Sequence, residues 1–353
     1  MKLYKKIIIL LIVLIFSYIL FSLLQNRTKI YAEIESRRDK ETFGTSEKSE
    51  IVQAENKTIT GIQNINSNYS NMPLHQYCMK ASYNSAITGN YVSIDMLKYV
   101  LSRGCRFLDF EVFYIEDKPC VSYTTDTTFK TIETQNVIPL DNILTSVVSN
   151  AFSSLCSNPK DPVFIHLRIK SKDTNIYKEV AKVVEYTLKD KLYRKRIDEK
   201  TALNDILGKV VLVIDKTINY YYQDDSYCNV SKNCVDLTTF VNLESGGDYL
   251  RVDRYTDVLN KYPVMPKVNG DNVTADIEKY QLILPDYNSK NVKNPSHGDF
   301  VLKYGCQIMP YRFYINDQNL EEYEEFFKDN KFAFVPLAHG IMHYEKIDEY
   351  ENS

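Results

Sequence analysis

Short apolar runs alternate with amphipathic stretches between Met72 and His343. The runs that read as strands are 77–83, 106–113, 119–124, 163–169, 209–214, 306–314 and 332–337. Three stretches between them place apolar residues on one helical face, at 94–102, 180–188 and 320–327. Fully apolar strands such as KVVLVI are typical of a parallel sheet that helices cover on both faces. The order and the length predict an α/β fold with one TIM-type (β/α)8 barrel.

An uncharged segment of eighteen residues, Ile7 to Leu24, precedes this region and has basic residues on both sides. At 1.5 Å per residue a helix of this length spans about 27 Å, close to the hydrocarbon thickness of a bilayer. The alternative is a cleaved signal peptide, but residues 25–32 contain no A-x-A cleavage pattern. We therefore expect a basic N-terminus at 1–6, a transmembrane anchor at 7–24, a flexible polar tether at 25–70, the barrel domain at 71–343 and a tail at 344–353.

The side of the membrane that the barrel occupies does not follow from charge, because basic residues flank the apolar segment at both ends. Asn-x-Ser/Thr sequons follow the segment at Asn26, Asn56, Asn68, Asn229 and Asn272. All seven cysteines also follow it, and Cys228 and Cys234 are near enough in sequence to pair. An odd count leaves at least one cysteine free or in an intermolecular bond. These features favour a lumenal or extracellular barrel behind a single-pass anchor.

Polar residues stand near the ends of the first strand-like runs, where a barrel carries its reactive groups. They are Tyr83, Asn84, Asp109, Glu111, Asp126 and Arg168. Asp109 and Glu111 point to the same side of an extended strand. Two acids on the inner face of a barrel are costly unless they are paired or bind a metal. His166 lies within an apolar run and is predicted to be a core histidine with satisfied hydrogen bonds.

Three segments in this order, PLHQYCMKASYNSA, LKYVLSRGCRFLDFEVF and DKPCVSYTTDTTFKTI, resemble the X region of phosphoinositide-specific phospholipase C, of the PLC-like phosphodiesterase superfamily. The likeness continues in PVFIHLRIK and LGKVVLVIDK. It returns in GCQIMPYRFYINDQNLEEYEEFFKDNKFAFVPL, which resembles the end of the Y region. The resemblance implies a barrel of the same type, phosphoric diester hydrolase chemistry on a phosphoinositide lipid, and a calcium ion at the site.

The two catalytic histidines of the family are replaced in this chain. Tyr83 stands at the position of the first histidine, and Asp126, in YTTDT, at the position of the second. General acids and bases contribute about 10²- to 10⁴-fold each, so losing both predicts little turnover. A free phenol has a pKa of about 10 and is a poor substitute. Asp126 could act as an acid only if burial raised its pKa strongly.

The metal and phosphate positions of the family also differ. Asn84 retains a calcium ligand, the family's Glu-x-Asp is inverted to Asp109-x-Glu111, and Arg168 stands where the family has another metal-binding glutamate. Lys216 matches a phosphate-binding lysine. Two carboxylates with one arginine carry the same net charge as three carboxylates with a divalent cation. We therefore expect Arg168 to take the place of calcium in a buried salt bridge with Asp109 and Glu111.

Three interpretations remain open. The favoured one is a catalytically degenerate, membrane-anchored protein that keeps affinity for a lipid headgroup or for another protein. The second is an active hydrolase with Asp109 or Glu111 as base and Asp126 as acid, and the third is a structural membrane protein in which the acids form only an ion-pair cluster. No cofactor is expected, with calcium bound only if Asn84, Asp109 and Glu111 keep a metal site. The net charge of −3 and the scattered basic residues argue against nucleic acid, and the oligomeric state is undetermined.

Overall fold

The computed structural model describes residues 18, 61–228, 234–274, 279–287 and 293–351. The predicted anchor at 7–24, apart from Tyr18, and the predicted tether up to residue 60 lie outside the described residues. Within the described part of the chain, no helix combines the length and the apolar character needed to cross a bilayer. The chain divides into two compact units, Met1–Glu50 and Ile51–Ser353, and the second unit is described below.

A nine-stranded sheet forms the centre of this unit, in the order β12-β9-β8-β7-β6-β3-β4-β5, with β2 also paired to β3. Its strands are β2 (Ala81–Ser82), β3 (Phe107–Ile115), β4 (Lys118–Ser122), β5 (Ile138–Pro139), β6 (Val163–Ile169), β7 (Val210–Asp215), β8 (Leu243–Ser245), β9 (Leu250–Arg254) and β12 (Tyr280–Leu284). The pairs from β2 through β3 and β6 to β12 are parallel, whereas β4 and β5 extend β3 in antiparallel fashion. The alternating sequence pattern therefore predicted the α/β class correctly.

The two edges of the parallel part approach the same segment of chain. Isolated parallel bridges join Leu282 in β12 to Ile308, and Ile308 to Met79. A further parallel bridge joins Ser82 in β2 to Tyr311. Met79 ends β1 (Tyr77–Met79), which pairs in antiparallel fashion with β13 (Phe334–Pro336). Residues 308–311 thus lie between the last and the first parallel strands.

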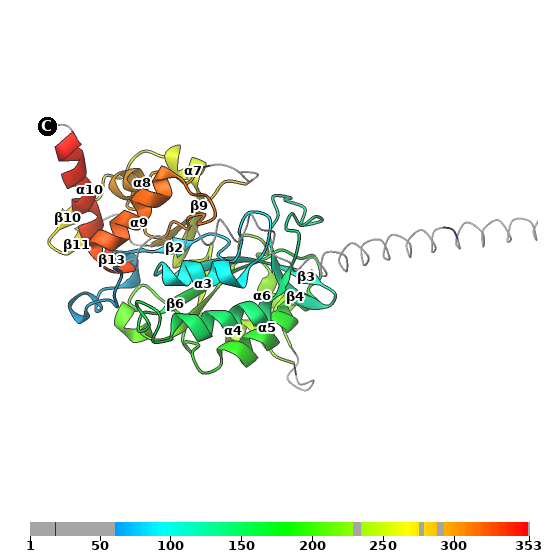
Figure 1. Cartoon of the computed structure of the whole chain (residues 1–353). Coiled ribbons are helices and arrows are strands. Elements are labelled where there is room, and N and C mark those ends of the chain that lie inside the picture. The colour runs from blue at the N-terminus through cyan, green and yellow to red at the C-terminus, as the bar shows by residue number, and fades with distance from the viewer. Residues whose placement is uncertain (1–17, 19–60, 229–233, 275–278, 288–292, 352–353) are drawn as a thin grey trace, which may run out of the picture. The chain divides into compact units, whose positions relative to one another are not determined.

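Helices connect most of the parallel strands. They are α3 (Ile94–Ser102), α4 (Leu140–Ala151), α5 (Asn175–Leu188), α6 (Tyr222–Ser226), α7 (Tyr255–Leu259), α8 (His297–Tyr304), α9 (Gln318–Asn330) and α10 (Leu337–Glu351). Short 3-10 turns at η1 (Ser67–Tyr69), η2 (Leu74–Gln76), η3 (Leu203–Ile206) and η5 (Leu237–Thr239) and the hairpin of β10 (Lys267–Asn269) with β11 (Asn272–Thr274) complete the elements. In Figure 1, α3, α4 and α5 lie side by side, and α8 contacts both α9 and α10.

The predicted helix at 94–102 illustrates how local sequence sets these elements. Ser93 caps its start by accepting a hydrogen bond from the backbone N–H of Met96. The helix ends at Ser102, and Gly104 follows the capping residue Arg103 with φ of +81°, a conformation that glycine adopts without strain. The apolar face of the helix, including Leu97 and Val100, is buried in the core.

The folded body extends beyond both predicted limits of the barrel domain. Ile62 is buried in the core, and the Gln63 N–H donates to the carbonyl of Lys331 at 2.7 Å. At the other end α10 continues past residue 343, and its Tyr344 ring stacks on Phe326 with centroids 5.2 Å apart. The residues at 61–70 and 344–351 therefore make contacts that a tether and a tail would lack.

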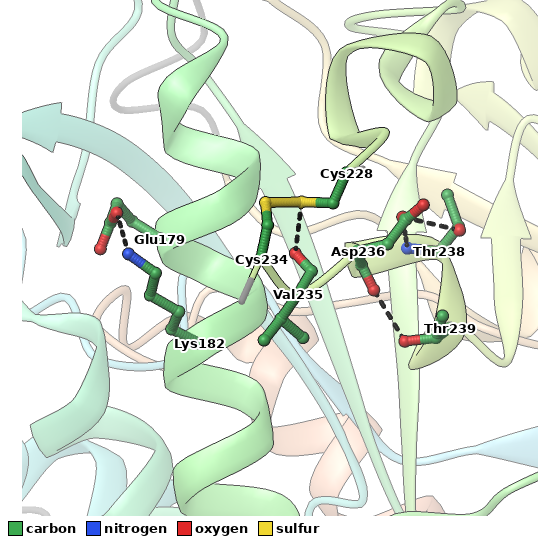
Figure 2. Close-up of a disulfide and its surroundings, with 8 residues drawn as sticks. All are labelled: Glu179, Lys182, Cys228, Cys234, Val235, Asp236, Thr238 and Thr239. Carbon is green, nitrogen blue, oxygen red and sulfur yellow. Dashed lines mark hydrogen bonds and ion pairs between the residues drawn. A yellow bond between two sulfur atoms is a disulfide. The ribbon is translucent and has the colours of Figure 1, made fainter. Parts of the chain in front are cut away.

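A disulfide joins Cys228 to Cys234, the pair that the sequence had marked as near enough to bond. It lies in the loop after α6, beside α5, where the Glu179–Lys182 ion pair is also seen (Figure 2). The other five cysteines are free thiols. Four of those are buried and Cys156 is partly exposed.

Candidate functional site

The central polar residues come from two neighbouring parallel strands. Asp109 and Glu111 lie on β3, and their register partners on β6 are His166 and Arg168. Asn84 follows β2, the other parallel neighbour of β3, and has a positive φ of 45°. Because side chains alternate along a strand, these residues share one face. All five are buried, so the strands bring the charges together away from water.

Asp109 has two hydrogen-bond partners on each carboxylate oxygen. Arg168 binds it through two nitrogens, with Nε 2.8 Å from Oδ1 and Nη2 2.6 Å from Oδ2. His166 Nδ1 lies 2.8 Å from Oδ1, and the backbone N–H of Asn84 donates to Oδ2 at 3.0 Å. Such two-point arginine–carboxylate contacts are strong and fix the geometry of both groups.

Glu111 is satisfied in the same way. Its Oε1 accepts hydrogen bonds from Arg168 Nη1 at 2.9 Å and from Asn84 Nδ2 at 3.4 Å. Its Oε2 accepts from the Thr124 N–H at 3.0 Å and lies 2.8 Å from the ammonium of Lys170. The buried salt bridge of Arg168 with both acids, predicted from the sequence, is therefore present.

Lys170 changes the charge balance that the sequence suggested. With Asp109, Glu111 and Arg168 alone the cluster would carry one negative charge, whereas the Lys170 ammonium makes it neutral. Lys170 lies two residues beyond Arg168 and hence on the same face. That alternation was visible in the HLRIK segment, and it was the signal that sequence reasoning missed.

Burial and pairing act on the pKa values of these groups in opposite directions. Burial alone would raise the pKa of Asp109, but Arg168 and His166 hold it well below its usual range. Burial opposes the charge of Arg168 too, yet Asp109 keeps its pKa well above the ordinary value. Burial lowers the pKa of Lys170, which Glu111 partly offsets. At neutral pH the Asp109–Arg168 pair is ionised.

His166 is a buried histidine with both ring nitrogens occupied, as predicted. Nδ1 faces Asp109, and Nε2 lies 2.8 Å from the hydroxyl of Ser245 on β8. Because the Asp109 carboxylate can only accept, His166 Nδ1 carries a proton and donates it to Oδ1. This order of groups is that of a serine–histidine–acid relay. All three side chains are fully buried, however, so a substrate cannot reach the serine.

Tyr83 covers the guanidinium of Arg168. Its ring centroid lies 4.6 Å from Cζ of Arg168 and 5.5 Å from Cζ of Arg312, and its exposed fraction is 7%. Burial raises the pKa of Tyr83 to about 12. The phenol therefore stays protonated at neutral pH and acts as a cover held by cation–π contacts.

Asp126 lies in the turn after β4, and within the described part of the chain its carboxylate bonds to residues of this turn and not to the ion-pair cluster. Its carboxylate accepts hydrogen bonds from the N–H and hydroxyl of Thr128, from the Lys130 N–H and from Thr131. The bonds from Thr128 lower the pKa of Asp126 below its usual range. The condition for an acid role, a strongly raised pKa, is therefore not met.

Lys216, the predicted phosphate ligand, belongs to a different group of side chains. It follows β7, and its Nζ lies 3.3 Å from Oε2 of Glu244 and 4.8 Å from the Tyr220 ring centroid. Glu244 precedes Ser245 on β8, so the two side chains point to opposite faces. The structure thus brings together Asn84, Asp109, Glu111, Arg168 and Tyr83, and leaves Asp126 and Lys216 outside that cluster.

The donor set does not suit a metal ion. Calcium takes six to eight oxygen ligands, whereas each carboxylate oxygen here already accepts from two protein donors. Over the residues whose placement is described, no group of three or more His, Cys, Asp or Glu side chains could hold a metal. Arg168 and Lys170 supply the positive charge that a cation would bring.

Comparison with known proteins identifies the relatives of this fold. Residues 70–216 match the family model of the phosphatidylinositol-specific phospholipase C X domain. PLC21 from L. pealei matches with a TM-score of 0.55 at 13% identity, covering 76% of this chain and 37% of that chain. PLC21 from S. officinalis matches with a TM-score of 0.57 at 14% identity, with the same two coverages. No curated protein matches the chain. The chain spans little more than a third of these two relatives, and the likeness to them concerns the fold.

Proposed function

We propose, from the premise that the chain carries a divergent X domain of the phosphatidylinositol-specific phospholipase C family, that it is a membrane-anchored protein of this fold that binds a phosphoinositide headgroup without cleaving it. One observation carries the proposal. All four carboxylate oxygens of Asp109 and Glu111 are occupied by protein donors, in a cluster whose charge is already balanced.

Hydrolysis of a phosphodiester needs a base with a free lone pair, an acid with a transferable proton, and positive charge on the phosphate. Asp109 has its lone pairs committed and its pKa lowered, so it is a weak base. The Tyr83 phenol has a raised pKa and Asp126 a lowered one, which makes each a poor acid at neutral pH. The lack of an effective base and the lack of an effective acid each lower the rate by a factor of about 10²–10⁴.

Headgroup affinity is the part of the family's function that survives these changes in our proposal. Lys216 and Arg254 follow β7 and end β9, at the same end of the parallel strands as Arg168. Each also lies over an aromatic ring, at 4.8 Å for Lys216 on Tyr220 and 3.9 Å for Arg254 on Tyr287. Cations at this end would attract a phosphorylated inositol ring.

Two finer structural statements belong to the same proposal. The parallel bridges through Ile308 and Tyr311 support closure of the sheet into a (β/α)8 barrel.

The Cys228–Cys234 disulfide supports an oxidising compartment, hence a lumenal or extracellular body behind the anchor at 7–24. Glycan attachment at Asn68 during synthesis into microsomes tests the orientation, and an unmodified chain would contradict it.

The decisive experiment uses the full chain in mild detergent. We expect myo-inositol 1-phosphate to bind in isothermal titration calorimetry, and Lys216→Gln to weaken it, while phosphatidylinositol yields no inositol phosphate with or without calcium. Asp141→Asn, a change on the exposed side of α4, serves as the matched control. Release of inositol phosphate that Asp109→Asn abolishes would overturn the loss of catalysis. Absence of headgroup binding would overturn the binding role and favour a structural protein.

A further inference from the structure

Two Asn-x-Ser/Thr sequons that are far apart in the sequence lie within the described residues. Asn68 belongs to η1, and Asn272 is the first residue of β11. The side chains of both are exposed, and neither triplet, Asn-Tyr-Ser or Asn-Val-Thr, has proline in the middle. A third triplet, Asn294-Pro-Ser, does have proline there, and Asn294 is buried and hydrogen-bonded. The sequon rule and the exposure therefore both select Asn68 and Asn272.

The fold brings these two asparagines to the same face of the body. The ring of Tyr69, next to Asn68, meets the ring of His339 edge-on, with centroids 5.1 Å apart. His339 Nε2 lies 3.0 Å from Oδ1 of Asp271, which precedes Asn272. Because His339 contacts the neighbours of both asparagines, the two sequons flank the first turn of α10. In Figure 1 the hairpin of β10 and β11 lies beside this helix.

This face lies at the amino-terminal end of the parallel strands. η1 and η2 precede β1, and the hairpin of β10 and β11 precedes β12. The Val273 N–H in the hairpin donates to Oε1 of Gln76 in η2 at 3.2 Å, which holds these segments together. Arg168, Lys216 and Arg254, by contrast, lie near the carboxyl-terminal ends of β6, β7 and β9. The two sequons are therefore remote from the end that we propose to bind the headgroup.

The hairpin has an edge that a sugar chain would cover. Within the described part of the chain, β10 and β11 pair only with each other. A strand with unpaired backbone groups can pair with another chain, and proteins prevent this by covering or blocking such edges. A glycan is bulky and hydrophilic, so one attached to Asn272 at the start of β11 would block this edge.

Ser70 restricts the transfer of a glycan to Asn68 to the unfolded chain. The sequon requires a serine or threonine hydroxyl at this position. In the folded body Ser70 is 3% exposed, and its hydroxyl donates to the carbonyl of Ser67 at 3.1 Å. The sugar chain is therefore attached before η1 forms, and the exposed side chain of Asn68 leaves room for it afterwards.

We infer that Asn68 and Asn272 carry N-linked oligosaccharides, which stand together at the amino-terminal end of the strands and keep this end in solvent. In each transfer the asparagine Nδ2 forms a bond to C1 of the sugar chain. The C1–O bond to a lipid diphosphate donor breaks, and the amide gives up one proton. The inference rests on the lumenal or extracellular placement proposed above, because this transfer takes place on the lumenal side of the membrane.

The test locates sugar chains on the full chain synthesised into endoplasmic-reticulum microsomes. Enzymatic release of N-linked glycans in heavy-oxygen water converts each modified asparagine to an isotope-labelled aspartate, which peptide mass spectrometry identifies. We expect the label at positions 68 and 272. Asn68→Gln and Asn272→Gln should each remove one labelled peptide and leave the other unchanged.

Glu185→Asn is the control that separates this inference from the membrane orientation. It creates an Asn-Tyr-Thr sequon on the exposed side of α5, with the same middle residue as the sequon of Asn68. Label at this control position with none at 68 or 272, or at only one of them, would overturn the inference and leave the lumenal placement standing. Label at none of the three positions would overturn both.

Discussion

Replacing Arg168 by methionine should destabilise the body strongly. The guanidinium makes two hydrogen bonds to Asp109, one to Glu111 and one to Asn84, all buried. Without it the cluster keeps two carboxylates against the single ammonium of Lys170, leaving one uncompensated negative charge. Breaking a buried ion pair by removing one partner costs about 3–5 kcal/mol. We expect a loss near the middle of that range, because Asp109 retains two other donors.

The pH dependence of this loss follows from the sign of the shift at Asp109. In the wild type its pKa is lowered, so its stabilising contribution is present above the unfolded value and is lost as pH falls below it. In Arg168→Met burial is no longer opposed by the guanidinium and raises that pKa. The variant then gains stability as Asp109 protonates, so the deficit shrinks from pH 8 to pH 5.

Urea unfolding of the full chain in mild detergent, followed by the near-ultraviolet circular dichroism of its tyrosines, measures both effects. Asp109→Asn placed in the Arg168→Met background should recover part of the loss, with a coupling energy of about 2 kcal/mol or more for groups in direct contact. A deficit below about 1 kcal/mol, the usual size for an exposed pair, or strictly additive single changes, would refute the reasoning.

Three further outcomes are expected. Burial lowers the pKa of His297 to about 3, so on acidification the unfolded chain is protonated first and the free energy of unfolding falls by about 2 kcal/mol from neutral pH to pH 5. His297→Gln should reduce the change of the urea midpoint with pH over that interval, and an unchanged slope would contradict this. Brief alkylation with iodoacetamide, read by peptide mass spectrometry, should modify Cys156 before the four buried thiols; early labelling elsewhere would show an opening of the core. Gly104→Ala should cost more than Gly89→Ala, although both have positive φ, because a Cβ at 104 meets Ile62 at 2.9 Å whereas none is near at 89; equal costs would show that Ile62 is not packed there.

Local periodicity was enough to predict the main ion pair and elements such as β3, β6 and α3, whereas the predicted strand at 306–314 forms only isolated bridges. Alternation along a strand placed Asp109 and Glu111 on one face. Arg168 is always charged and lies on another apolar strand, so it needed a buried anionic partner. The parallel register that sets Glu111 opposite Arg168 turned this expectation into a contact.

Contacts that depend on the register of distant strands could not be predicted in the same way. Ser245 on β8 reaches His166 on β6 across β7, and Thr124 reaches Glu111 from the end of a hairpin. Neither partner has a sequence pattern that separates it from other polar residues. Lys216 was matched to a phosphate-binding lysine, but a side chain in a loop at a strand end can point to either face of the sheet. Here it points toward Glu244.

The limits of the body were underestimated for a related reason. Residues 61–70 are polar and have no apolar period, which indicates a tether by composition. Two isoleucines attach them, Ile62 buried in the core and Ile65 packed against it, together with backbone hydrogen bonds such as Gln63 to Lys331. Backbone pairing of this kind leaves no mark on composition.

The pairing of Asp109 and Glu111 with Arg168 and Lys170 also bears on how this protein responds to its surroundings. A metal that balances two carboxylates is a separate solute, and its occupancy follows its concentration, competing chelators and dilution. A cation on the same polypeptide is supplied once, at synthesis, and cannot diffuse away. The body should therefore have the same stability in a calcium-rich and a calcium-poor compartment. The amount of folded protein at a membrane would then depend on its synthesis and its targeting, and not on the calcium concentration.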